Sequence, residues 1–227
     1  MIKRIILFII CFLFFNLSAQ NSSTNYPNTP SKSSDRNFGI FSGYSYSIIT
    51  NKEKINEKSP NGRHSFHFGV SYQLSELVDH LIFEPNIRYS QKGIRYEGIR
   101  LDNNTTLNYM NNYFSYLDII AKSKLDIPDF PIYPFIGFSS GILLSAKSDI
   151  KSTYKENNAT YYEYSETIDL KKDCSTLDFG FLLGVDLVLQ KSFFIGLEYN
   201  LSLNSFDHDT NDKSKHQTMF VYIGLLY

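Results

Sequence analysis

Five histidines are the side chains of this sequence best suited to acid–base chemistry or metal binding. His64 and His67 are three apart on a predicted strand, so they point to opposite faces and cannot share a metal or a substrate. His80 lies in a predicted turn, and His208 and His216 lie in or beside the last long loop. No histidine has a serine spaced to form a base–nucleophile pair on one strand face. The sequence therefore predicts no catalytic residue and no enzyme.

The densest group of oxygen ligands is the run from Asp207 to Asp212, which reads Asp-His-Asp-Thr-Asn-Asp. Calcium takes about six to eight oxygen ligands, and such a loop would supply several of them. The run has no glycine, and its spacing is not that of an EF-hand. We therefore interpret residues 207–212 as a hydrated surface loop and predict no metal and no cofactor. Calcium binding remains the alternative, and calorimetry would test it.

Six charged residues recur on the polar faces of predicted strands: Glu84, Arg88, Asp118, Lys122, Asp186 and Glu198. If these faces line the inside of a small barrel, the charges can pair with one another, as buried charges require. The alternative is a narrow conduction path. Side chains normally fill a barrel of about eight strands, so we expect a closed lumen.

The elements that position these residues are predicted to be strands, because apolar and polar residues alternate with a period of two. In residues 66–74 every even position is apolar, whereas the odd positions are His, Gly, Ser and Gln. Strict alternation of this kind indicates strands with one apolar and one polar face. Eight such segments are predicted: 38–48, 66–74, 81–90, 113–122, 132–146, 177–189, 193–203 and 218–227. The expected fold is all-β, an eight-stranded antiparallel up-and-down transmembrane β-barrel.

The predicted connections alternate in length. Residues 50–63, 92–112, 148–173 and 204–216 form long loops, whereas residues 75–80, 123–131 and 190–192 form shorter turns. Outer-membrane barrels have long extracellular loops and short periplasmic turns. An even number of strands returns both ends of the barrel to the periplasmic side.

The first nineteen residues predict export. Lys3 and Arg4 precede the apolar run 5–15, and small residues end it, which is typical of a signal peptide cleaved after Ala19. An uncleaved anchor is the alternative, but the run is shorter than the roughly 17–25 residues of a membrane-spanning helix. The expected organisation is signal peptide 1–19, flexible N-terminal lead-in 20–37 and barrel domain 38–227.

Cleavage would remove Lys3 and Arg4, leaving 20 basic and 23 acidic residues. Without a long basic run, nucleic acid is not an expected partner. Cys174 would be the one cysteine left, so no intrachain disulfide is expected, and we interpret it as a small strand residue.

The polar faces of the strands are rich in Gly and Ser and contain few lysines. A water-facing exterior normally has many Lys and Glu residues, whereas small residues suit a cramped lumen. We therefore expect the apolar faces to meet lipid. A secreted lipocalin-like carrier of an apolar ligand is one alternative, with the faces reversed. A barrel enzyme acting on lipids is another, and it lacks a visible catalytic set.

Residues 83–93, Phe-Glu-Pro-Asn-Ile-Arg-Tyr-Ser-Gln-Lys-Gly, resemble the third-strand signature of the PorT-like family of small outer-membrane β-barrels. The positions of that family's later strands match residues 116–119, 133–141, 178–186 and 197–199. Residues 221–227 resemble the C-terminal signal for barrel insertion, whereas Ile120 stands where the family commonly has proline. The resemblance implies a barrel without a catalytic set. One family member is associated with secretion of surface proteins.

These observations predict an integral protein of the cell outer membrane that has no enzymatic activity and presents long extracellular loops. A related version of this hypothesis makes the barrel an accessory in envelope assembly or protein secretion. Its expected partners are outer-membrane lipid and proteins that contact the extracellular loops or the periplasmic side. Loop 148–173 contains Tyr154, Tyr161, Tyr162 and Tyr164 and is the expected recognition surface.

Overall fold

The computed structural model describes residues 37–50, 59–78, 80–101, 104–156, 160–189, 192–205 and 214–227. The predicted signal peptide 1–19, all but the last residue of the lead-in 20–37, and the 207–212 run lie outside these residues. Those predictions therefore stay untested. Within the described ranges, no helix combines the length and the apolar character needed to cross a bilayer.

The described chain is almost entirely β-structure. Its single short helix is the 3₁₀ turn η1 (Lys171–Asp173). The strands are β1 (Phe38–Thr50), β2 (Asn61–Tyr72), β3 (Leu74–Val78), β4 (Leu81–Arg100), β5 (Thr105–Leu125), β6 (Ile132–Glu156), β7 (Thr160–Asp169), β8 (Leu177–Leu189), β9 (Phe193–Ser202) and β10 (Lys215–Leu226).

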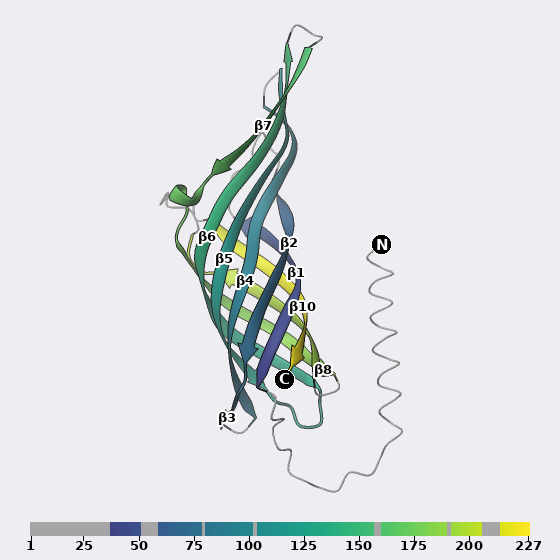
Figure 1. Ribbon diagram of the computed structural model, residues 1–227, viewed down its shortest axis with the longest axis vertical. Helices are drawn as coiled ribbons and strands as arrows, with labels where there is room; N and C mark the ends of the chain where they lie inside the picture. Colours follow the sequence, from purple (N-terminus) through teal and green to yellow (C-terminus); the bar gives the residue numbers. More distant parts are fainter. Residues whose placement is uncertain are drawn as a thin grey trace, which may run out of the picture. The chain divides into compact units, whose positions relative to one another are not determined.

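Eight of these strands close into a ring, and all the pairings are antiparallel (Figure 1). The order around the ring is β1, β2, β4, β5, β6, β8, β9 and β10, and β10 pairs again with β1. The short β3 pairs with β4, and β7 pairs with β6, so both lie outside the ring. Closure leaves no open edge within the ring, as a sheet in lipid requires. The predicted eight-stranded antiparallel barrel is confirmed.

Side chains alternate strictly between the two faces of the barrel wall. Along β10, Thr218, Phe220 and Tyr222 are buried inside, whereas Met219 and Val221 are exposed outside. The outward face is apolar all round the ring: Ile119 is 55% exposed and Phe138 is 63% exposed. This arrangement confirms the predicted orientation. A lipocalin-like barrel would place its apolar face inside.

Aromatic residues border the apolar belt at both of its ends. At the turn end, the end with the short connections, Phe38 lies opposite Tyr72 and its amide donates to the Tyr227 carbonyl. At the other limit of the belt, Tyr46 and Tyr199 lie in one row, each opposite Met219. Such girdles are typical of barrels that span a membrane.

The predicted loops 92–112 and 148–173 are wrong over most of their length. β4 and β5 continue as a paired hairpin to Arg100 and Thr105, and β6 and β7 form a second hairpin to Glu156 and Thr160. Both project from one end of the barrel, which we call the hairpin end (Figure 1). At the turn end, β3 also replaces part of the predicted turn 75–80.

The hairpins were predicted as loops because the polarity of the two strand faces inverts beyond the apolar belt. Inward positions of β4 are polar from Glu84 to Lys92, but Ile94, Tyr96 and Ile99 are apolar and buried. The outward Arg95 and Glu97 pair at 2.5 Å, and each side chain is 49% exposed. A strand prediction that requires the apolar residues to stay on one face therefore ends the strand at this inversion. Above the belt, the inward residues form an apolar core with Ile49, Leu107, Phe114, Tyr116, Leu143, Ala146 and Cys174.

Candidate functional site

The six predicted charges all lie inside the barrel, where Arg88 is the centre of the largest network. Its Nε lies 3.2 Å from Asp118 Oδ2, and its Nη1 lies 2.8 Å from Glu198 Oε1. Lys122 Nζ lies 2.9 Å from the other oxygen of Glu198. The Arg88 guanidinium also lies over the Phe220 ring, 3.8 Å from its centroid. β4, β5, β9 and β10 each contribute one or more of these residues.

Two smaller groups flank this network along the lumen. Toward the turn end, Lys124 Nζ lies 2.5 Å from both Glu84 and Asp186, and the Tyr222 hydroxyl donates to Asp186 at 2.7 Å. Toward the hairpin end, Lys92 Nζ lies 2.6 Å from Asp178. The predicted pairing of the inner charges is therefore confirmed.

Lys92 and Lys124 were missing from the predicted network, and so was the ion pair made by Asp178. Each lysine lies two residues beyond an inward residue, Ser90 or Lys122, so each continues the alternation. Both lie just past the ends of the predicted strands. Extending the strands by two residues would have found them.

Buried polar and apolar side chains line the lumen along its length. The apolar core of the hairpin end lies on one side of the charged layer. A second apolar cluster is interleaved with the charges themselves, because its Phe220 stacks on Arg88 and its Tyr222 donates to Asp186; its members are Phe41, Phe194, Phe220, Tyr222 and Leu226. The buried charges are paired with one another, as burial requires, and each of these pairs joins two different strands of the wall.

The histidines are distributed largely as expected. His64 stacks outside against Tyr44, while His67 points inside, where its ring meets Phe220 edge-on at 4.8 Å. The two therefore face opposite sides, as predicted. His80 lies in the turn between β3 and β4, with a positive φ of 65°. His208 lies outside the described residues.

His216 lies beside the last long loop, as predicted, but inside the strand that follows it. It lies within β10 and is buried in the lumen, 5.3 Å from the Phe114 ring. The reason is that β10 begins at Lys215, three residues before its predicted start. Cys174 is also not in a strand, because it follows η1 and is buried in the apolar core of the hairpin end. Across the described ranges, no three His, Cys, Asp or Glu side chains form a group that would hold a metal ion.

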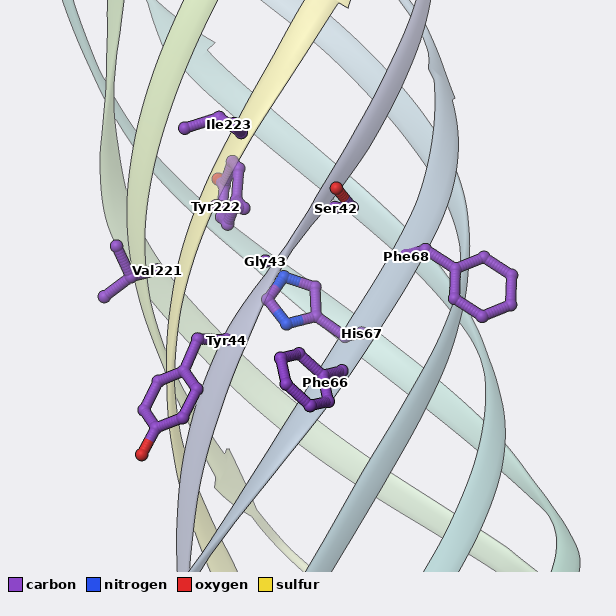
Figure 2. A pocket seen from close by; sticks show the side chains of 9 residues that line it. All are labelled: Ser42, Gly43, Tyr44, Phe66, His67, Phe68, Val221, Tyr222 and Ile223. Carbon is purple, nitrogen blue, oxygen red and sulfur yellow. The ribbon is translucent and has the colours of Figure 1, made fainter.

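A shallow groove of about 520 Å³ crosses the outer face of β1, β2 and β10. It exists because Ser42 is a small residue at an outward position, opposite Phe68 on one side and Ile223 on the other. Figure 2 shows Ser42 and Gly43 on β1 between the rings of Phe66 and Phe68 and the aliphatic side chains of β10. Ser42 and His67 point to opposite faces of the wall, so they do not form a nucleophile–base pair.

Gly43 is required for the close approach of β1 to β10 behind this groove. A Cβ at Gly43 would lie 2.1 Å from the Val221 carbonyl oxygen and 2.6 Å from the Tyr222 Cα. Because both atoms belong to the backbone, Gly43→Ala is expected to cost about 1–3 kcal/mol of unfolding free energy. Urea unfolding followed by circular dichroism measures the loss. Ser42→Ala, on the outward side of the same strand, is the control and should stay within about 0.5 kcal/mol. Equal stability of both variants would contradict the packing argument.

The β6–β7 hairpin presents the tyrosines that the sequence singled out. Tyr154 lies opposite Tyr162 on one face, Tyr164 is on the same face, and all three are exposed. On the other face, Lys151 lies 2.9 Å from Glu163, and this hydrogen-bonded pair raises the pKa of Lys151. The tyrosines are exposed as predicted, but on paired strands instead of a loop. The side chain of Tyr161 lies outside the described part of the structure.

Several solved structures are similar to this chain. Ail of Yersinia pestis, in complex with the heparin analogue sucrose octasulfate, is 14% identical, with 85% of this chain and 99% of that chain covered and a TM-score of 0.48. Neisserial surface protein A is 11% identical, with 84% and 97% covered and a TM-score of 0.45. The N-terminal β-barrel domain of Pseudomonas aeruginosa OprF is also 11% identical, with 85% and 98% covered and a TM-score of 0.36.

No curated protein sequence matches the chain. The family model of the outer membrane protein beta-barrel domain matches residues 18–208, which is most of the chain. This match agrees with the closed eight-stranded ring and its outward apolar belt. The chain therefore belongs to the outer membrane protein beta-barrel domain family and is a protein of the bacterial outer membrane.

Proposed function

We propose that this protein acts by binding at the cell surface, without catalysis, and that the hairpin end is its recognition surface. The observation that supports the proposal is the folded state of that end. The β4–β5 and β6–β7 hairpins bury an apolar core of their own, which includes Ile94, Tyr96, Ile99 and Leu107. A prearranged surface binds partners without first having to order a long loop.

The lengths of the connections indicate which end faces outward. The connections at the turn end are short, including the one between β8, which ends at Leu189, and β9, which begins at Phe193. The two long hairpins lie at the opposite end. Since outer-membrane barrels keep their short turns in the periplasm, we assign the hairpin end to the exterior. In this proposal, residues 1–19 are the signal peptide that directs the chain to the periplasm.

Binding is favoured over catalysis by the state of the inner polar groups. The buried charges of the lumen pair with one another, and Ser42 and His67 point to opposite sides of the wall. In its more specific form, the proposal makes the protein a PorT-like accessory of envelope assembly or protein secretion. The resemblance of residues 83–93 supports that form.

An epitope tag at residues 157–159, between β6 and β7, tests the orientation. We expect antibody to label this tag on intact cells. The matched control is the same tag inserted after Asp129, in the connection between β5 and β6 at the turn end, which antibody should reach only after permeabilisation. Labelling of the control tag on intact cells, with the hairpin tag hidden, would overturn the assignment. If the hairpin tag is labelled on intact cells, cross-linking from that tag would identify the proteins that bind there.

A further inference from the structure

β7 has an open edge. It pairs with β6 in an unbroken register from Lys147–Asp169 to Glu156–Thr160, and no described strand pairs with its other side. Every second residue of such a strand directs its N–H and C=O groups away from its partner. These groups give the edge a regular row of donors and acceptors. The ring below has no comparable edge, because its eight strands close on themselves.

The sequence of β7 lacks most of the devices that protect open edges. Lysine, proline and bulges commonly block pairing with other chains. β7 reads Thr-Tyr-Tyr-Glu-Tyr-Ser-Glu-Thr-Ile-Asp, with no lysine, arginine, proline or glycine, and its pairing with β6 has no bulge. Tyrosine, threonine and isoleucine are residues that favour strands. The edge is therefore suited to accept another strand.

The charges of β7 indicate what kind of strand would fit. Glu163, Glu166 and Asp169 are its charged residues, and all three are acidic and exposed. Tyr162 and Tyr164 are each 55% exposed on one face, where a cation can lie over an aromatic ring. Cross-strand pairs of opposite charge stabilise a sheet, whereas like charges destabilise it. A strand with basic side chains is the complementary neighbour.

We propose that β7 binds an extended, basic segment of a protein partner, which adds to the β4–β5–β6–β7 extension as its next strand. This inference rests on the proposed function and specifies the chemistry of the partner. Backbone hydrogen bonds along the open edge supply the affinity, and the acidic residues and tyrosines select for lysine and arginine.

A second copy of the chain is a poorer occupant of the edge. Two copies in one membrane project β7 in the same direction, so they cannot pair in the antiparallel manner used throughout this sheet. Self-pairing would also bring the acidic residues of both strands onto one seam, with no cation from either β7.

The test uses the full protein in lipid nanodiscs and a labelled ten-residue peptide in which lysine alternates with threonine and valine. Fluorescence anisotropy measures binding. A peptide of the same sequence that is N-methylated at every residue keeps its charges but cannot donate backbone hydrogen bonds, and we expect it not to bind. A peptide with glutamate in place of lysine should also fail to bind. Equal binding of the methylated peptide would show attraction by charge alone and would overturn strand addition.

Charge reversal on β7 locates the site. We expect the triple variant Glu163→Lys, Glu166→Lys, Asp169→Lys to bind the lysine peptide about tenfold more weakly and to gain binding of the glutamate peptide. Whichever face of β7 the peptide lysines take, the variant replaces its cross-strand pairs of opposite charge with pairs of like charge. The control variant Glu97→Lys, Asp126→Lys, Asp129→Lys makes the same change in net charge away from this edge and should bind as the unmodified protein does. Equal loss in both variants, or no binding of the lysine peptide, would overturn the proposal. Antibody labelling of the tag at residues 157–159 does not depend on the peptide. A labelled tag together with failed peptide binding would therefore overturn this inference and leave the proposed function standing.

Discussion

Replacing Arg88 with methionine is expected to lower the free energy of unfolding by about 3–5 kcal/mol, the usual cost of removing one partner from a buried ion pair. Arg88 holds two carboxylates, at 3.2 Å in Asp118 and 2.8 Å in Glu198, and its side chain is almost completely buried. Without it, Asp118 keeps a hydrogen bond from Ser90, and Glu198 keeps its ion pair with Lys122. Among the described residues, the lumen already contains five buried carboxylates and four buried cations, so the loss of Arg88 leaves five carboxylates against three cations. The additional unbalanced carboxylate charge is the source of the loss.

The measurement is urea unfolding of the refolded barrel, followed by circular dichroism and by the shift in gel mobility on heating. Arg95→Met is the matched control, because Arg95 also pairs with a carboxylate, that of Glu97, but in water. Exposed pairs contribute only about 0–1 kcal/mol, so this variant should be nearly unchanged. If Arg88→Met and Arg95→Met lose the same small amount, the lumen network does not hold the wall together.

The barrel itself could be predicted from alternation because, wherever the outer face meets lipid, outward residues are mostly apolar and inward residues are mostly small or polar. Residues 66–74 alternate without exception, and the structure places them in β2, its junction with β3, and the first residue of β3. The same rule put Glu84, Arg88 and Asp118 inside, where they are now found. The rule follows from the solvent on each side of the wall, so it is valid only inside the apolar belt.

Beyond the belt the outer solvent changes from lipid to water, and the pattern changes with it. Ile94 and Tyr96 are inward and apolar in the same strand where Arg88 and Lys92 are inward and charged. A local pattern of apolar and polar residues does not identify the outer solvent. For this reason the hairpins were predicted as loops, and the open edge of β7 could not be predicted at all. Whether a strand has an open edge depends on which strands pair with it, and the local sequence of β7 does not encode its pairing partners.

Ile119→Arg is the second change with a large expected effect. Ile119 faces outward on β5, six residues from Tyr113 and six from Leu125, which mark the two limits of the apolar belt on that strand. Arginine near the middle of a bilayer costs a barrel about 2–4 kcal/mol, because lipid cannot solvate the guanidinium. We therefore expect a loss of that size in the unfolding free energy measured in phospholipid vesicles.

Tyr162→Arg is the control, since Tyr162 and Ile119 are equally exposed, at 55%, but Tyr162 lies on the β6–β7 hairpin beyond the belt. Water solvates an arginine there, so the change should stay within about 0.5 kcal/mol. Because the two positions are equally exposed, a difference in the loss of unfolding free energy reports the medium around the side chain and not its degree of exposure. A similar small effect at both positions would mean that water surrounds the whole outer face. That result would contradict the placement of the apolar belt in the membrane.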